Sequence, residues 1–385
     1  MHLSPKPRAG NWLVPLLRTL IGRLRALFSG RRPSPSPARP ESLVASVEHD
    51  DKLRALDEVL KVTSFFADVD ECLKKSGKAK ADFLIAIKPN FMVFYSSKDP
   101  SSHTDPELVD HLTKGLRQRG FTNLKVVESR NVLGKWYENR DVKTVARAAG
   151  YTSTNYEIID LTLEAIPFTF GGEFGDDFVG RTWMEADYRI SFAKNKTHPA
   201  NRYTLALKNI FGVTTAEDKY LEYHKKKEWD VAVVEMFRAF PVHFGFIDAF
   251  VSADQAFGFR GDKTPRDTRA ILGSKDILAL DWVGAMRMGL DPLDSRLMRK
   301  AVEEWGTPKA RVDGKADVYE NWDNTPFLLD KLDDAIEECY AMHSFFTHAI
   351  MLEPDELFRE RNVGFLARTR RLLDLDQEPR RAPPP

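Results

Sequence analysis

The sequence predicts an α/β protein with a mainly parallel sheet and flanking helices. Short, uninterrupted apolar runs such as 83–87 are typical of strands that are buried on both faces. Segments with helical periodicity alternate with these runs, and this order is typical of parallel strands connected by helices. The chain of 385 residues is 42% hydrophobic, which is enough to form a large core.

The first half of the predicted body contains three strands separated by helices. The helix at 105–119 has Pro106 in its first turn and stops at Gly120, as expected for a helix start and a helix end. A second helix at 142–149 is closed by Gly150. The predicted strands are 83–87, 124–127 and 156–161, and a glycine-rich loop follows through Gly175.

The second half continues the same alternation of apolar runs and helical segments. The predicted strands are 188–192, 246–251 and 269–272. The predicted helices are 203–210, 229–240, 276–288, 328–340 and 354–373. We therefore expect an α/β domain over residues 50–352, followed by a C-terminal helix and a disordered tail over 353–385.

The first 30 residues form a basic amphipathic arm. Residues 1–40 carry eight Lys and Arg side chains and no acid, and apolar residues recur at helical spacing from Trp12 to Phe28. Such a helix would lie at an anionic membrane surface, with its arginines toward the lipid. A targeting segment and a helix docked on the globular body remain alternatives. A proline- and serine-rich linker is predicted over 31–49.

Charge and cysteine content exclude several classes of protein. Lys plus Arg and Asp plus Glu both number 57, so no net charge attracts a nucleic acid, and we expect no nucleic-acid partner. The two cysteines, Cys72 and Cys339, are too few for a disulfide framework, a cysteine zinc site or an iron–sulfur cluster. A single bridge between them remains open. Two free thiols fit a reducing compartment better, so we expect a cytoplasmic protein, peripheral at the membrane if the arm binds lipid.

Polar side chains follow the predicted strands and mark a candidate site. Carboxyl ends of parallel strands meet at one edge of a sheet, which is where ligands bind in such folds. Lys194, Lys196 and His198 alternate, so they would share one side of an extended segment. Thr204 and Lys208 would share one face of a helix.

This cluster is predicted to bind a small anion. The candidate substrate-binding residues are Lys88, Asn90, Lys194, Lys196, Thr204 and Asn209. A lysine that is desolvated beside other cations loses its proton readily, so Lys208 or His198 is the candidate for moving a proton. His103, in a loop before Asp105, is a weaker candidate near Lys88. The alternative is a solvated basic loop beside an amphipathic helix.

Four aspartates lie near the last two predicted strands. Asp248 and Asp254 are candidate ligands for a divalent cation, because hard cations prefer several oxygen ligands. Asp276 is interpreted as a helix cap, and Asp281 should have a polar partner if it is buried.

Several of these segments also carry a family resemblance. They are Lys88-Pro89-Asn90, Thr104-Asp105-Pro106, Lys196-Thr197-His198, Thr204 to Gly212, Ile247-Asp248 and Ser274 to Asp281. Together they resemble the bacterial and archaeal "domain of unknown function 362" family, and the element Leu207 to Gly212 is the most specific part. The resemblance implies the fold boundaries and the site cluster but names no reaction. The chain lacks the ferredoxin-like cysteine segment of many members, and Phe257 to Gly261 replaces a usual Gly-Pro pair.

Two functions follow from these observations. The first is an enzyme that acts on a small phosphate- or carboxylate-bearing substrate through the Lys/His/Asn cluster. The alternative is a non-catalytic binding or assembly factor at a membrane surface that serves a redox or biosynthetic partner.

Overall fold

The computed structural model describes residues 39–172, 174–198, 201–254, 266–320, 322, 356–359 and 361. The predicted arm over 1–30 lies outside the described residues, as does the helix predicted at 328–340. The helix predicted at 354–373 and the tail lie outside them as well, apart from the few positions named above. Within the described residues we find no helix with the length and apolar character that a membrane span requires.

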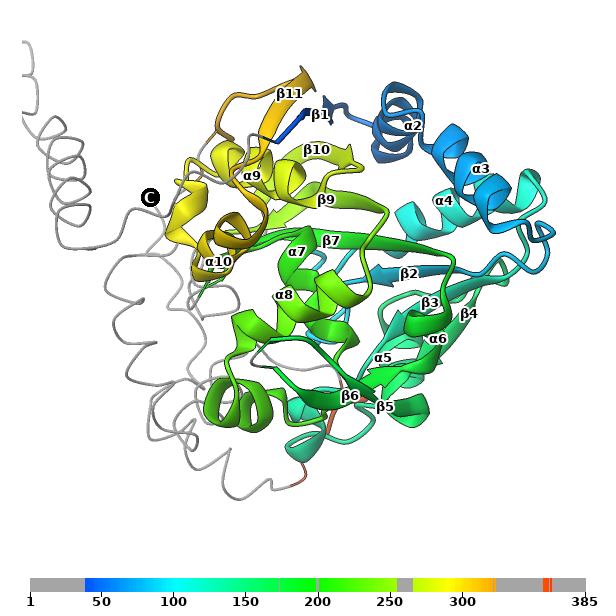
Figure 1. Ribbon diagram of the computed structural model, residues 1–385, viewed down its shortest axis with the longest axis vertical. Helices are drawn as coiled ribbons and strands as arrows, with labels where there is room; N and C mark the ends of the chain where they lie inside the picture. The colour runs from blue at the N-terminus through cyan, green and yellow to red at the C-terminus, as the bar shows by residue number, and fades with distance from the viewer. Residues whose placement is uncertain are drawn as a thin grey trace, which may run out of the picture.

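A nine-stranded, mostly parallel sheet forms the centre of the part that the structure describes (Figure 1). Strands β9, β7, β2, β3 and β4 run parallel to one another, β10 is antiparallel to both of its neighbours, and β1 pairs in parallel with β11. The order across the sheet is β11 (Lys309–Gly314), β1 (Glu41–Glu48), β10 (Arg266–Ser274), β9 (Phe244–Ala253), β7 (Tyr188–His198), β2 (Ile85–Pro89), β3 (Leu124–Glu128) and β4 (Glu157–Asp160). The short strand β8 (Arg202–Thr204) pairs with β7. The predicted fold class is confirmed.

Helices cover both faces of this sheet. One layer contains α2 (Lys52–Val62), α3 (Phe65–Ser76), α4 (Pro106–Gln118) and α5 (Val142–Ala148). The other contains α6 (Arg181–Glu185), α7 (Ala206–Asn209), α8 (Trp229–Ala239), α9 (Ile277–Arg287) and α10 (Arg296–Trp305). Neighbouring residues of β2 face opposite layers. Ile85 and Ile87 pack in the core with the layer of α2 to α5, whereas Ala86 packs with the layer of α6 to α10.

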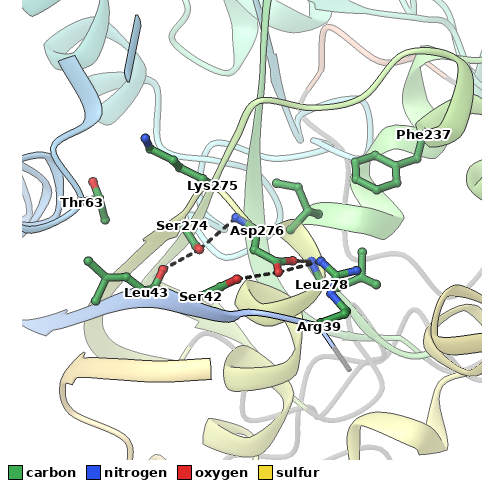
Figure 2. Close-up of a pocket in the computed structure, with 10 residues that line it drawn as sticks. Arg39, Ser42, Leu43, Thr63, Phe237, Ser274, Lys275, Asp276 and Leu278 are labelled. Atoms are coloured by element: carbon green, nitrogen blue, oxygen red, sulfur yellow. Dashed lines mark hydrogen bonds and ion pairs between the residues drawn. The ribbon is translucent and has the colours of Figure 1, made fainter. Parts of the chain in front are cut away.

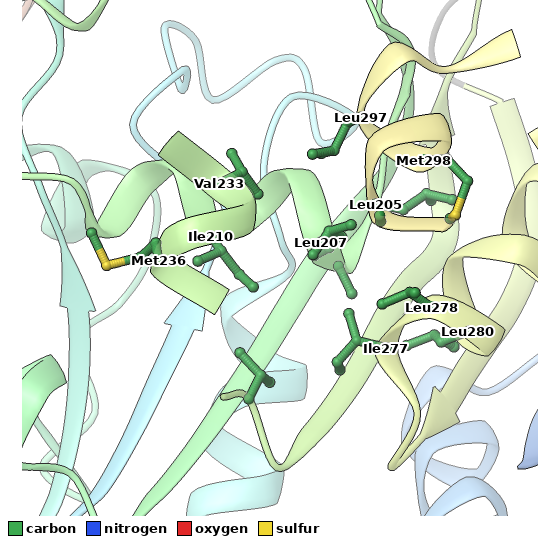
Figure 3. Close-up of a cluster of buried hydrophobic side chains, with 14 of the residues drawn as sticks. Leu205, Leu207, Ile210, Val233, Met236, Ile277, Leu278, Leu280, Leu297 and Met298 are labelled. Carbon is green, nitrogen blue, oxygen red and sulfur yellow. The ribbon is translucent and has the colours of Figure 1, made fainter. Parts of the chain in front are cut away.

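The second layer packs through aliphatic side chains contributed by four helices. Figure 3 shows residues of α7, α8, α9 and α10 converging over the sheet. The labelled residues are Leu205, Leu207, Ile210, Val233, Met236, Ile277, Leu278, Leu280, Leu297 and Met298. The site described below rests on this cluster, because α7 lies within it.

Three local predictions were wrong. Residues 41–48, predicted as linker, form β1, which is buried because it inserts between β10 and β11. The glycine-rich loop contains a hairpin of β5 (Ala165–Thr169) and β6 (Asp176–Gly180). The single helix predicted at 203–210 is divided into β8, α7 and the 3₁₀ turn η3 (Ile210–Val213), because Tyr203 and Thr204 pair with β7. The remaining short elements are η1 (Val132–Lys135), η2 (Leu161–Glu164), the π-helix η4 (Tyr220–Lys226) and η5 (Pro292–Asp294).

The predicted helix ends at Gly120 and Asp276 are present, and Asp105 adds a cap that was not predicted. The Asp105 carboxylate accepts a hydrogen bond from the Glu107 amide at the start of α4, and Gly120 beyond its end has a φ of 92°. The Asp276 carboxylate accepts from the amides of Leu278 and Ala279, so its interpretation as a cap is confirmed. These local signals set the helix ends irrespective of the rest of the fold.

Truncating a buried leucine of α9 should destabilise the protein. Leu280 is 0% exposed, so we expect Leu280→Ala to lower the free energy of unfolding by about 2–5 kcal/mol, as urea denaturation would measure. Met286 lies on the same helix and is 51% exposed, so Met286→Ala should change it by only about 0.5 kcal/mol. Equal losses in the two variants would contradict this packing of α9.

Candidate functional site

The candidate site lies where the carboxyl ends of four neighbouring parallel strands meet. Strands β9, β7, β2 and β3 are consecutive in the sheet. Lys88 of β2 lies opposite Ser191 of β7, and Lys194 of β7 lies opposite Asp248 of β9. The expectation that the segments after Lys88 and Phe192 reach the same edge is confirmed, although Lys194 lies within β7 and not in a loop.

A buried ion pair connects β2 to β3. Lys88 Nζ lies 2.9 Å from Glu128 Oε1, and both side chains are almost completely buried. Lys88 Nζ also donates to the Pro89 carbonyl at 2.7 Å and to Asn209 Oδ1 at 3.1 Å. Burial lowers the pKa of Lys88 and raises the pKa of Glu128, while the attraction between the two charges opposes both shifts.

Gly212 allows the backbone to pack directly against this ion pair. A Cβ atom at this position would lie 2.5 Å from both Glu128 Oε1 and Lys88 Cε. Ser129 Oγ fixes residues 212–214 by donating to the Gly212 carbonyl at 2.6 Å and to the Thr214 carbonyl at 2.7 Å. The glycine that ends the Leu207 to Gly212 element is therefore required by space.

A second buried ion pair connects β7 to β9. Lys194 Nζ lies 2.9 Å from Asp248 Oδ2, and both side chains are buried. The same carboxylate accepts from the Asp105 amide at 2.9 Å and from the Phe250 amide at 3.1 Å. Asp248 thus anchors the start of α4 as well as neutralising Lys194.

Asp248 and Asp254 were predicted from the sequence as ligands of a divalent cation, and the structure places both in the interior. Asp248 is engaged by Lys194 and two backbone amides, and Asp254 is buried just beyond the end of β9. Among the described residues, no group of three or more His, Cys, Asp or Glu side chains is arranged to hold a metal ion. The divalent cation therefore stays a prediction.

Lys196 is the third buried lysine of the cluster. Its side chain is 4% exposed, and Nζ donates to Asn90 Oδ1 at 2.9 Å. Thr204 of β8, also predicted to bind substrate, lies directly opposite Lys196. Burial, together with repulsion from neighbouring lysines led by Lys208, lowers the pKa of Lys196 to about 7.

A chain of amide hydrogen bonds connects Lys196 to Lys88. Asn90 Nδ2 donates to Asn209 Oδ1 at 3.2 Å, and Asn209 Nδ2 donates to the Lys88 carbonyl at 2.7 Å and to Ser191 Oγ at 3.1 Å. Each amide therefore has a fixed orientation. Two of the predicted binding residues, Asn90 and Asn209, form the centre of the network.

Lys208 and His198 lie at the margin of this network. Lys208 Nζ lies over two aromatic rings, 4.1 Å from the Phe211 centroid and 4.9 Å from the Trp229 centroid. His198 Nδ1 accepts from the Asn201 amide at 3.2 Å at the end of β7. The helix thus directs Asn209 into the centre and places Lys208 beside it. The catalytic roles of Lys208 and His198 stay predictions.

Asp281 fixes the start of the short helix that carries Asn209. Its two carboxylate oxygens accept from the amides of Ala206 and Leu207, each at 2.8 Å. The partner expected for a buried Asp281 is therefore the amino end of α7. Burial raises the pKa of this carboxyl group to about 7, against the effect of the two hydrogen bonds.

The buried His103 lies close enough to two of the lysines to be repelled by them. Its Nδ1 lies 3.1 Å from Ser102 Oγ, and its ring meets Phe94 edge-on. Burial, and then repulsion from Lys194, lowers the pKa of His103 to about 4, so the imidazole is neutral at neutral pH. The sequence indicated this residue only weakly, because its approach depends on the fold of the loop after β2.

Lys219 and Ser191 were missed by the sequence analysis. Lys219 Nζ donates to the carbonyls of Ala216 and Arg130, and burial lowers its pKa to about 8, with Glu128 acting in the opposite direction. Ser191 Oγ donates to the Ala206 carbonyl at 2.8 Å. No sequence pattern marks either residue, because each is brought to the site by distant segments.

A separate pocket of about 510 Å³ lies at the opposite edge of the sheet (Figure 2). Ser274 pairs with Gly245 near the start of β9, whereas the lysine cluster lies toward the carboxyl ends. Arg39 and Asp276, which both line the pocket, form an ion pair of 2.7 Å, and Ser42 Oγ donates to the same carboxylate. The lining residues are Arg39, Ser42, Leu43, Thr63, Phe237, Ser274, Lys275, Asp276, Ile277 and Leu278. The lysine cluster contributes nothing to this pocket.

Comparison with known proteins identifies the family. The model of the family described as a domain of unknown function (DUF362) matches residues 85–286, and the chain belongs to this family. The matched region contains every candidate site residue named from the sequence. The predicted absence of an iron–sulfur segment stays a prediction. A sequence comparison with curated proteins gives no match.

One similar solved structure is the lactate racemase apoprotein from Thermoanaerobacterium thermosaccharolyticum. The two chains share 11% sequence identity with a TM-score of 0.38. The alignment covers 66% of this chain and 58% of the racemase chain, so it spans less than two thirds of that protein. At this TM-score the likeness carries no argument about activity.

Adding one methyl group at Gly212 should disturb the Lys88–Glu128 pair. We expect Gly212→Ala to lower the free energy of unfolding by about 1–3 kcal/mol, because the pair cannot shift without losing buried hydrogen bonds. Gly171→Ala is the matched control, since the nearest atom to a Cβ there is Glu235 Oε2 at 3.4 Å. Equal unfolding curves for the two variants in urea would contradict the close approach.

Removing the Lys196 amine should stabilise the protein most at low pH. The folded pKa of about 7 lies below the ordinary value of 10.5, so between these values the unfolded state binds more protons and wild-type stability rises with pH. We expect Lys196→Met to be more stable than wild type below pH 7. Its advantage should shrink toward pH 10, by at most about 1.4 kcal/mol per pH unit.

The measurement is urea denaturation of both proteins across this pH range. Lys74, exposed on α3, offers the control Lys74→Met, whose difference from wild type should be constant with pH. A constant difference for Lys196→Met as well would show that the amine stays charged in the folded protein.

Proposed function

We propose that the protein is an enzyme that acts on a small anionic substrate bearing a phosphate or carboxylate group. The observation that carries this proposal is the gathering of Lys88, Lys194 and Lys208 around buried Lys196, whose pKa their repulsion helps to lower. Like charges held together destabilise one another, and an anion bound among them relieves that repulsion. Lys88 and Lys194 form buried ion pairs with Glu128 and Asp248.

In this proposal the residues divide into two roles. Lys194, Asn90 and Thr204 orient the anion, with Lys208 adding positive charge beside it. Lys196 moves the proton, because a group whose pKa lies near the working pH is the most effective acid or base. It takes the role that the sequence assigned to Lys208 or His198.

Anion binding is tested by thermal denaturation of the full chain. We expect inorganic phosphate, glycerol phosphate or pyruvate to raise the melting temperature, because a ligand at 100 times its Kd adds about 2.7 kcal/mol of stability. Lys196→Met and Asn90→Ala should lose this shift, whereas Lys74→Met should keep it. No shift with any of the three anions, or an unchanged shift in Lys196→Met, would contradict the proposal.

The alternative function is a binding or assembly factor at a membrane surface. It is favoured by the basic amphipathic pattern of residues 1–30, which lie outside the described residues. Binding of the full chain to anionic vesicles, its loss on removal of residues 1–38, and the absence of any anion-induced thermal shift would together favour this alternative. Vesicle binding accompanied by an anion shift would instead describe an enzyme held at the membrane.

A further inference from the structure

We propose that residues 90–105, which connect β2 to α4, form a lid over the lysine cluster, and that residues 356–359 latch this lid through Phe358. The inference rests on the proposed function, because it describes how a substrate anion reaches the cluster. Lys88, Lys194 and Lys196 are 1%, 1% and 4% exposed, so a dissolved anion can come between their amines only after part of the protein moves.

The proposed lid is a long loop whose ends are joined. Residues 90–105 are all described and contain no helix or strand, and irregular loops longer than about 12–15 residues are usually functional, active-site lids among them. The Asn90 amide donates to Thr104 Oγ1 at 2.9 Å, and the Thr104 amide donates to the Asn90 carbonyl at 2.8 Å. Thr104 Oγ1 also donates to the Phe192 carbonyl at 2.8 Å. The joined ends are therefore anchored to β7, while the middle of the loop can move.

Both ends of this loop lie against the lysine cluster. At one end, Asn90 Oδ1 accepts a hydrogen bond from Lys196 Nζ at 2.9 Å. Near the other end, His103 is close enough to Lys194 and Lys196 for their charge to add to the effect of burial, which lowers its pKa to about 4. Residues 90–105 therefore cover one side of the cluster, and their movement would open it.

The proposed latch packs on the loop that follows β3, which includes residues 131–140. Two hydrogen bonds of 2.8 Å hold it there, from the Glu138 amide to the Arg359 carbonyl and from Asn139 Nδ2 to the Leu357 carbonyl. Phe358 lies between these two positions and is 2% exposed, whereas Leu357 is 42% exposed. The latch thus inserts one aromatic ring into the protein.

Phe358 joins the latch to the lid. Its ring meets the ring of Phe94, in the middle of the lid, edge-on with 5.9 Å between the centroids. The Arg140 guanidinium carbon lies 4.6 Å from the Phe358 centroid. Arg140 in turn donates to the Phe94 carbonyl at 2.5 Å and to the Met92 carbonyl. One buried ring therefore supports both the lid and the arginine that holds the lid.

The burial of Arg140 favours opening. Its side chain is 4% exposed, it donates to two neutral carbonyls, and its Nε is buried without a hydrogen-bond partner among the described residues. Burial lowers the pKa of this guanidinium to about 10, because the charged form is destabilised away from water. When Phe358 leaves its site, water reaches the guanidinium and stabilises it. Such local opening requires less free energy than unfolding of the whole protein.

The test is hydrogen–deuterium exchange of the full chain, measured by mass spectrometry of its peptides. We expect Phe358→Ala to speed exchange in peptides from 91–103 at least tenfold, because the buried amides of the lid reach water when it opens. Leu357→Ala is the matched control and should leave this exchange unchanged, since Leu357 is the exposed neighbour. Peptides from α9 should exchange at the wild-type rate in both variants, because the lid opens locally.

Acetylation by acetic anhydride tests whether the lid covers the cluster. Lys88, Lys194 and Lys196 should be modified at least tenfold faster in Phe358→Ala than in wild type. Exposed Lys74 should be modified equally fast in both proteins. Faster exchange of 91–103 without faster modification of the three buried lysines would overturn the lid.

A second variant keeps the latch testable if Phe358→Ala exchanges faster throughout the chain. Asn139→Gly removes the hydrogen bond to the Leu357 carbonyl, retains Phe358 and suits the φ of 59° at this position. It should speed exchange in 91–103 and leave α9 unchanged. Wild-type exchange of 91–103 in Asn139→Gly, or in a folded Phe358→Ala, would overturn the latch.

The outcomes distinguish this inference from the proposed function. An anion-induced thermal shift together with unchanged exchange would overturn the lid and leave the proposed enzyme standing. Faster exchange and faster lysine modification without any anion-induced shift would support the lid and refute the proposed enzyme.

Discussion

The burial of the Lys88 ammonium at the end of β2 is the constraint on which the arrangement of the site depends. A charge that is removed from water without a partner is very costly, and removing one partner of a buried pair typically costs about 3–5 kcal/mol. Glu128 supplies that partner from the next strand, and Asn209 and the Pro89 carbonyl occupy the remaining donor positions. Gly212 follows from the same constraint, since only a residue without Cβ lets the chain close over the pair.

The second buried ion pair, Lys194–Asp248, connects the sheet to the helical layer. Asp248 neutralises Lys194 and at the same time accepts from the amide that begins the α4 segment, so one carboxylate joins two strands to a helix. On the other face of the sheet, the Asp281 carboxylate accepts hydrogen bonds from the first two backbone amides of α7 and so joins α9 to α7. The third buried lysine, Lys196, donates to the amide oxygen of Asn90.

The fold was predicted well where local signals are strong. The helices ending at Gly120 and Gly150 and the apolar strands of the parallel core were found because caps, glycines and apolar runs depend on nearby residues alone. Strand β1 was missed because the segment from Glu41 to Glu48 follows a proline-rich stretch and becomes a strand by inserting between β10 and β11. The β5–β6 hairpin was missed because the glycines between its strands favoured a loop in the sequence analysis.

The sequence by itself determined the α/β class, the family and the set of residues at the carboxyl edge, because strand ends can be read from apolar runs. Only the tertiary structure decided how those residues divide their roles. Lys88, Lys194 and Lys196 are alike in sequence, and what distinguishes them is which distant side chain lies within hydrogen-bonding distance: Glu128, Asp248 or Asn90. Lys208 and Asn209 are neighbours in the chain, yet capping of α7 by Asp281 turns the amide inward and leaves the amine over Phe211 and Trp229. Such differences arise from long-range packing and the cost of burying charge, which no local pattern records.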